Sequence, residues 1–430
     1  MSQFEGARVY NLFPRLVGQV SQWPRHFDRI KGMGFNWVYL NPLSYPGFSG
    51  SLYSVKDYYA YNPLFFEGST PKEAEKELRQ VLAEAHRRGL KVMMDLVINH
   101  TAIDAVLAQE HPEWYQKNPD GTTKNPSCKL ENGEIIVWGD LAQIDNELKD
   151  RPKDRQALWD YWLALVKHSL SLGFDGFRCD AAYHVPSALW KYLIEATKAD
   201  YPQVRFFGET LGCTAKETIA VADAGFDWIF NSSKYWNFEE EWFLKEFRKV
   251  VGVAPSIAFP ESHDTPRLAT ETDGNQSTIK MRYAFAAFLS AGIMIPVGYE
   301  YGFRTPLNVV TTLPHHWETP SFDLTSFIAL VNEIKKSHRV FNEDRDIEVI
   351  TPGNSRVFAF IKESADGREK ALIVINKDTE GWQKVEFPDL FGMMDRGQLK
   401  DVSPGHRMEE VPCNFEYHLP PGEVKVFIAE

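Results

Sequence analysis

The stretch KVMMDLVINH, residues 91–100, decides the fold. It is a short apolar run that ends in polar residues, and it follows a segment with clear helix boundaries at residues 71–88. Thr70 and Pro71 are typical of a helix start, and Gly89 after two arginines is typical of a helix end. A buried strand directly after a helix is the unit of a parallel sheet, so this stretch predicts the α/β class.

The same pairing of apolar run and helix recurs along the chain. Eight apolar runs lie at residues 7–13, 37–42, 91–98, 174–181, 205–211, 226–231, 256–261 and 292–299. Helices are expected between most of them, at residues 24–31, 71–88, 154–172, 187–199, 215–224, 239–250 and 278–290. Eight strands connected in this way predict a (β/α)8 TIM barrel.

Two regions depart from this rhythm. Residues 101–152 carry turn signals such as NPDG and few periodic apolar positions, which predicts a small inserted domain after the third strand. Residues 341–430 show short alternating runs separated by Gly and Pro, which predicts a C-terminal antiparallel, β-sandwich-like domain. The catalytic barrel is therefore assigned to residues 1–100 and 153–340.

The composition excludes several classes of protein. Of the 430 residues, 43% are hydrophobic and 25% charged, as in ordinary globular domains rather than disordered chains. We find neither an apolar run of transmembrane length nor a signal-peptide pattern, so we expect a cytoplasmic protein without a membrane partner. The net charge of −12 and the lack of a basic run speak against nucleic acid. Four scattered cysteines without a CxxC pair indicate reduced thiols.

Acidic residues end several of the predicted strands. Asp180 and Glu209 lie near the ends of the fourth and fifth runs, and Asp264 follows the seventh. Side chains at the carboxyl ends of barrel strands converge on one site, so we expect these three carboxylates to lie close together. The other polar residues at such strand ends are Arg178, His100 and His263.

Arg178 and Asp180 are two residues apart and so lie on one face of their strand. A guanidinium beside a carboxylate keeps it ionised, as a nucleophile requires, whereas a carboxyl with less compensation can hold a proton and act as an acid. Two carboxyls with separate roles are typical of a glycosidase. A structural ion pair and a divalent-metal hydrolase are alternatives, but no closely spaced ligand pair supports a metal site.

The segments DLVINH, GFRCDAAYH, FGETL and PESHD resemble, in this order, the four signature segments of the α-amylase family of glycoside hydrolases, family 13. WVYLNPL and YSVKDY also resemble segments of that family. The resemblance spans the chain, and it implies the same plan of barrel, insertion after the third strand and C-terminal β domain.

The resemblance also implies residue roles. Asp180 matches the nucleophile, Glu209 the general acid/base, and Asp264 the carboxylate that holds sugar hydroxyls. The implied mechanism is double displacement through a β-glycosyl enzyme. It requires no cofactor; calcium is possible, but its ligands cannot be assigned. The implied substrate-binding residues are Tyr53, His100, Arg178, His184 and His263. The implied structural supports are Asp57, Asp95 and Asn99, the last a calcium ligand in many amylases.

The expected substrate is an α-1,4-glucan or a maltooligosaccharide, cleaved by a retaining α-glycosidase. HPEWYQKNPDG at residues 111–121 and ADAGFDWIFN near the sixth strand are similar to bacterial maltosyltransferases that use maltose 1-phosphate. An α-glucan transglycosylase or maltosyltransferase, with a sugar phosphate as a possible donor, is therefore the alternative. A non-catalytic carbohydrate-binding or interaction module is a remote alternative, and the oligomeric state is left open.

Overall fold

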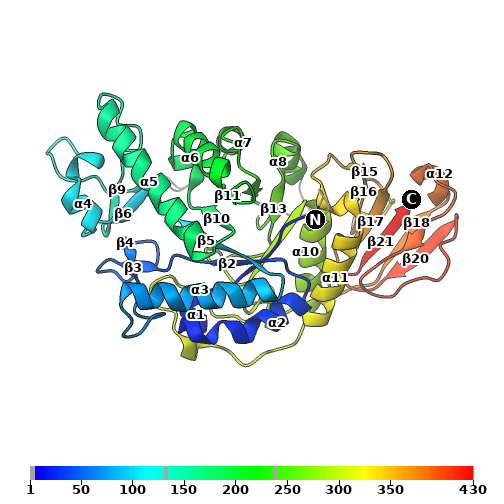
Figure 1. The fold of residues 1–430 in the computed structure, drawn as a ribbon. Helices are drawn as coiled ribbons and strands as arrows, with labels where there is room; N and C mark the ends of the chain where they lie inside the picture. Colours follow the sequence, from blue (N-terminus) through cyan, green and yellow to red (C-terminus); the bar gives the residue numbers. More distant parts are fainter. Residues whose placement is uncertain (1–4, 130–133, 237–240, 430) are drawn as a thin grey trace.

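The computed structural model describes residues 5–129, 134–236 and 241–429, and its centre is a closed barrel of eight parallel strands (Figure 1). Each predicted apolar run contains one barrel strand, and β1 closes the barrel by pairing with β14. The predicted (β/α)8 barrel is therefore confirmed. Its strands are β1 (Arg8–Asn11), β2 (Trp37–Leu40), β5 (Lys91–Leu96), β10 (Gly176–Cys179), β11 (Arg205–Glu209), β12 (Trp228–Phe230), β13 (Ser256–Ala258) and β14 (Gly292–Pro296).

Helices surround this barrel (Figure 1). They are α2 (Pro24–Gly32), α3 (Pro71–Arg87), α5 (Pro152–Leu172), α6 (Ser187–Asp200), α7 (Ala215–Ala222), α8 (Trp242–Val250), α10 (Gln276–Leu289) and α11 (Thr325–Ser337), with the short α1 (Pro14–Val17) and α9 (Leu268–Glu271). Thr70 and Glu73 form a reciprocal capping box on α3, as the sequence predicts. The expected start of the helix at 239–250 falls partly on residues 239 and 240, outside the described residues. α11 was not predicted from the sequence.

Two small sheets lie between β5 and β10. The elements there are β6 (His100–Ala102), α4 (Val106–Glu110), β7 (Ser127–Lys129), β8 (Ile135–Val137) and β9 (Leu141–Gln143). β6 pairs with β9, and β7 pairs with β8. A further hairpin, β3 (Ser44–Pro46) with β4 (Val55–Tyr61), follows β2 and was not predicted as such. These segments follow the carboxyl ends of β2 and β5, where polar side chains gather.

The C-terminal region consists of antiparallel strands, as predicted. A five-stranded sheet contains β15 (Glu348–Ile350), β16 (Val357–Glu363), β17 (Lys370–Asn376), β21 (Val424–Ala429) and β19 (Lys400–Asp401). A second sheet pairs β18 (Gln383–Phe387) with β20 (Phe415–Leu419), and α12 (Leu390–Met394) lies between them in sequence. The two sheets share an apolar core, and Phe358 of β16 packs edge-on against Phe285 of α10. The β region is thereby joined to the barrel.

The barrel interior is filled by apolar side chains, among them Val9, Met93, Phe207 and Ile257. All four are fully buried, so the barrel is a packed core. The four cysteines carry free thiols. Within the described ranges, no helix is long and apolar enough to cross a membrane.

Candidate active site

Three carboxylates meet at the carboxyl ends of the barrel strands. Asp180 directly follows β10, Glu209 is the last residue of β11, and Asp264 lies in the loop after β13. The guanidinium of Arg178 joins them: its Nη1 lies 2.5 Å from Asp180 Oδ1. Its Nη2 lies 3.9 Å from Glu209 Oε2 and 3.9 Å from Asp264 Oδ2. The structure thus brings together the carboxylates that the sequence analysis grouped.

Asp95 of β5 binds the guanidinium of Arg178. Arg178 Nη1 lies 3.1 Å from both carboxylate oxygens of Asp95, and both side chains are buried. The hydroxyls of Tyr39 and Tyr53 each donate to Asp95 Oδ2 at 2.6 Å. The carboxylate oxygens of Asp95 therefore accept hydrogen bonds from the arginine and two tyrosines. This is what we expect of a residue that supports the site.

Burial dominates the ionisation of these carboxyls. It raises the pKa of Glu209 to about 7, although the charge of Arg178 acts in the opposite direction. It also raises the pKa of Asp180 and Asp264, again against Arg178. Asp264 is 46% exposed, so solvent moderates the rise there. The prediction that Arg178 favours ionised Asp180 has the right sign for that pair, but desolvation opposes it and prevails.

Tyr53 and the two predicted histidines lie beside this cluster. The rings of Tyr53 and His263 stack in parallel with centroids 5.7 Å apart, and the Tyr53 hydroxyl lies 2.7 Å from His263 Nε2. The same nitrogen is 3.1 Å from Asp264 Oδ2. His100 Nε2 lies 3.1 Å from the backbone oxygen of Tyr53. Burial lowers the pKa of His263 to about 3 and of His100 to about 4, so both rings are neutral at pH 7.

His184 and Asp57 lie farther out. The exposed His184 ring packs on Tyr183 with centroids 4.2 Å apart, in the turn that follows Asp180. Asp57, on β4, accepts a hydrogen bond from the backbone of Tyr59 at 2.8 Å. Among the described residues, no hydrogen bond or ion pair joins Asp57 to the three carboxylates. The structure therefore places His184 in the turn after Asp180, where the charges of the two side chains interact, and leaves Asp57 in the β3–β4 hairpin.

Asn99 is the residue for which the resemblance implies a calcium ligand. Its Oδ1 is buried and has no hydrogen-bond partner in the described part of the chain, so this oxygen fits the role of a ligand. Its backbone oxygen accepts from Ile144 at 3.1 Å and is thus engaged. No group of three or more His, Cys, Asp or Glu side chains in the described ranges is arranged for a metal ion. Calcium binding thus stays a prediction.

Three residues of the site were missed by sequence reasoning. Tyr39 and Asn41 follow the alternation of β2, and Asn41 Nδ2 donates to the Tyr53 hydroxyl at 3.0 Å. Ser262 joins Tyr39, Arg178, Glu209, His263 and Asp264 in lining one small pocket. Glu261, which ends the seventh predicted run, turns away and pairs with buried Arg267 at 2.8 Å. The two-residue spacing of Tyr39 and Asn41 in WVYLN places both on one face of the strand, but it does not identify the partners of their side chains.

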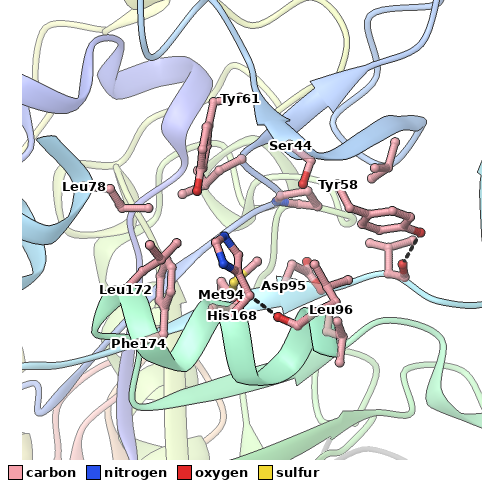
Figure 2. A pocket seen from close by; sticks show the side chains of 16 residues that line it. Ser44, Tyr58, Tyr61, Leu78, Met94, Asp95, Leu96, His168, Leu172 and Phe174 are labelled. Carbon is pink, nitrogen blue, oxygen red and sulfur yellow. Dashed lines mark hydrogen bonds between the residues drawn. The ribbon is translucent and has the colours of Figure 1, made fainter. Parts of the chain in front are cut away.

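A second pocket lies outside the barrel wall, among β4, β5, α3 and α5 (Figure 2). Its lining is mostly apolar and includes Tyr61, Leu78, Leu172 and Phe174. The Tyr58 hydroxyl at its edge already donates to the backbone oxygen of Val97 at 2.8 Å. It offers few free polar groups to a sugar, so the carboxylate cluster is the candidate active site.

Comparisons with known proteins place this chain among glucan-acting enzymes by similarity. Residues 2–121 match the family described as glycogen debranching enzyme, glucanotransferase domain. The α-1,4-glucan:maltose-1-phosphate maltosyltransferase of Burkholderia pseudomallei is 26% identical over 86% of this chain and 33% of its own length. Alpha-amylase 2 of Dictyoglomus thermophilum is 24% identical over 85% of this chain and 65% of its own. The chain thus spans a third to two thirds of these relatives.

The solved structures match over the whole chain. An α-amylase of Lactobacillus plantarum superposes with a TM-score of 0.79 at 20% identity, covering 100% of both chains. The fold is therefore that of the α-amylase structures, and the relatives agree with the resemblance that the sequence shows to the α-amylase family. Within that class, this chain is similar to maltose-1-phosphate maltosyltransferases as well as to amylases.

Proposed function

We propose that this protein is a retaining enzyme that cleaves α-1,4-glucans or maltooligosaccharides. The observation that carries the proposal is the convergence of Asp180, Glu209 and Asp264 on the single guanidinium of Arg178. A binding module would have no need of three buried or half-buried carboxyls around one cation, since burial of charge is costly. The names of the α-amylase and maltosyltransferase relatives support the choice of substrate class.

In the proposed mechanism, Asp180 attacks the anomeric carbon while Glu209 donates its proton to the leaving oxygen. The product of this step is a β-glycosyl ester of Asp180 and a free sugar hydroxyl. Glu209, now a carboxylate, removes a proton from the incoming water or sugar hydroxyl, whose oxygen displaces Asp180 and restores the α configuration. A pKa of about 7 leaves Glu209 partly protonated at neutral pH, which suits both steps. Only side chains take part, so the proposal requires no cofactor.

Transfer to a sugar is the second candidate function. It is supported by the similarity to maltosyltransferases over more than four fifths of this chain. Hydrolysis and transfer share Asp180 and Glu209 and differ only in the acceptor that attacks the glycosyl enzyme. The sites that bind the acceptor therefore decide between the two reactions.

Product analysis tests the proposal. Maltooligosaccharides are incubated with the enzyme, with and without inorganic phosphate, and the products are separated by chromatography. Shortened sugars alone indicate hydrolysis. Lengthened sugars, or maltose 1-phosphate formed only with phosphate, indicate transfer. If every maltooligosaccharide is returned unchanged, the proposed substrate class is wrong. A parallel incubation with a chelator tests the proposed independence of a metal.

A further inference from the structure

A series of buried hydrogen bonds leads from β1 toward the proposed nucleophile. Asn11 of β1 donates through its Nδ2 to Asn41 Oδ1 at 2.9 Å. Asn41 Nδ2 donates in turn to the hydroxyls of Tyr53 at 3.0 Å and Tyr39 at 3.2 Å. Both asparagines are fully buried, and burial of an amide is costly even when its polar atoms have partners. Polar side chains in a barrel interior that apolar ones could fill point to a role in function.

The direction of the hydrogen bonds in this series is fixed. Each tyrosine hydroxyl has one proton, and its distance of 2.6 Å to Asp95 Oδ2 places the proton there. The Nδ2 of Asn41 can only donate, so it holds each hydroxyl with the proton turned toward Asp95. Burial raises the pKa of Tyr39 and of Tyr53 well above the usual value, so both hydroxyls keep their protons. Asp95 Oδ2 thus has two permanent neutral donors.

The closest contacts of Asp95 are with these hydroxyls and not with the cation. Arg178 Nη1 lies 3.1 Å from both oxygens of Asp95 but 2.5 Å from Asp180 Oδ1. Asp95 is nevertheless the more deeply buried of the two carboxylates, with a side chain that is 0% exposed against 14% for Asp180. A buried carboxylate with fewer neutral donors draws a cation closer, because charge-assisted hydrogen bonds are the strongest it can form. The hydroxyls therefore leave the closest contact of Arg178 to Asp180.

We infer that Tyr39 is a positioning residue for the proposed nucleophile, Asp180. Its hydroxyl, oriented by Asn41, holds Asp95. Arg178 is thereby left to hold Asp180. The inference rests on the proposed function and deepens it, because it names the group that sets the position and charge of the arginine beside the nucleophile. Tyr39 itself is 1% exposed, so its hydroxyl is out of reach of a bound glucan.

Tyr39→Phe tests the inference, because it removes the hydroxyl and keeps the ring that packs in the barrel core. Arg178 should then move toward Asp95, and Asp180 should lose part of its compensating charge. We expect kcat on maltoheptaose to fall about 10- to 100-fold, as for a lost hydrogen bond to a charged group. KM should stay within about twofold of the wild type, because binding of the glucan is untouched.

The pH profile of kcat/KM separates this role from a merely structural one. Burial raises the pKa of Asp180, the charges of Arg178 and His184 lower it, and that of Asp264 raises it. Glu209 is the other titratable group that interacts with Asp180. Tyr39→Phe removes none of these groups, so only a displaced Arg178 explains a change at Asp180. We expect the acid limb of the profile to move up by about 0.5–1 pH unit.

Tyr283→Phe is the matched control. It also removes a fully buried hydroxyl, which donates to Asn332 Oδ1 at 2.9 Å on α10, outside the site. It should lower the free energy of unfolding and keep kcat and both limbs of the profile. Asn41→Leu is a second test variant, because it leaves the Tyr39 hydroxyl without its amide donor. It should move the acid limb in the same direction as Tyr39→Phe.

Three results would overturn the inference: an unchanged kcat in Tyr39→Phe, a lower kcat with an unmoved acid limb, or a rise in KM as large as the loss in kcat. A wild type that acts on no maltooligosaccharide would instead overturn the proposed function. In that event, 13C NMR of aspartate-labelled protein decides. The carboxyl resonance that Asp180→Asn lacks should titrate at higher pH in Tyr39→Phe than in the wild type, and equal titration overturns the inference.

Discussion

The backbone N–H of Ala181 donates to Glu209 Oε2 at 3.1 Å. The residue that follows Asp180 thus holds the carboxyl of the neighbouring strand. Ala181 has a φ of 40°, in the left-handed region, which costs a non-glycine residue roughly 1–2 kcal/mol. The strained turn links the two carboxyls on which the proposed mechanism depends, so their relative position is set by the backbone as well as by Arg178.

Replacement of the proposed nucleophile should abolish turnover and leave the fold intact. In Asp180→Asn the amide cannot form the glycosyl ester, so we expect kcat to fall by about three to five orders of magnitude. Steady-state kinetics measure the loss, and circular dichroism checks the fold. Asp28→Asn, which removes an exposed partner of Arg88, is the matched control and should retain activity. Near-normal activity of Asp180→Asn contradicts the assignment.

The pH dependence of kcat/KM should show the ionisation of Glu209. Its acid role requires the proton, and burial raises its pKa to about 7, so activity should fall as the pH rises above about 7. The acid limb should report Asp180, which must be ionised. Profiles between pH 4 and 9 for the wild type and Glu209→Gln provide the test. An alkaline limb that persists unchanged in Glu209→Gln would show that another group causes it.

Gly208 should not tolerate a methyl group. A Cβ at this position of β11 would lie 2.8 Å from Val221 Cγ1 and 3.3 Å from Phe226 Cδ1. We expect Gly208→Ala to lower the free energy of unfolding by about 1–3 kcal/mol and to reduce kcat, because the adjacent Glu209 shifts. Urea unfolding and kinetics measure both effects. Val221→Ala in the same chain should restore part of them.

Gly397→Ala is the matched control for that substitution, since no atom lies within 4 Å of a Cβ built there. It should leave unfolding and activity close to the wild type. Equal effects of the two substitutions would rule out the steric explanation at Gly208.

Because of Lys362, the free energy of unfolding should change with pH in the alkaline range. It lies buried on β16 and donates to the backbone oxygen of Leu289 at 2.8 Å, at the end of α10. Burial lowers its pKa to about 8, while the charges of Asp344 and Glu343 act in the opposite direction. Between pH 8 and 10.5 the unfolded chain binds this proton and the folded chain does not. The free energy of unfolding should therefore gain roughly 2–3 kcal/mol from this residue as the pH rises through that window.

Urea unfolding at several pH values between 7 and 10.5 measures this gain. Lys362→Met should lose that part of the slope, whereas Lys191→Met, which removes an exposed lysine, should keep it. The same slope in Lys362→Met and the wild type contradicts the prediction.

The barrel strands could be predicted because each is buried on both faces and reads as an apolar run. The carboxylates could be predicted because each stands where such a run ends. By contrast, α11 has no side-chain cap at Leu324, and β3 contains Pro46 and partly exposed residues, so neither carries a strong local signal. Their positions depend on contacts with distant parts of the chain.

Some site residues could not be predicted for the same reason. Tyr39 reads as an ordinary apolar residue of β2, and only the folded barrel brings its hydroxyl within 2.6 Å of Asp95. The extent to which burial raises the pKa of Asp180 also follows from packing, which the pairing with Arg178 alone does not reveal.

Barrel closure has a consequence for synthesis of the chain. β1 gains its second neighbouring strand only after β14 has been synthesised. Tyr10 of β1 likewise donates a hydrogen bond to Glu300, which lies 290 residues later in the chain. At about 5–20 residues per second, a ribosome needs roughly 15–60 s to make that intervening chain. During this time the nascent protein carries an unpaired strand edge, the kind of surface on which chains aggregate. A pause in translation before residue 292 should therefore reduce the yield of folded protein more than a pause after it.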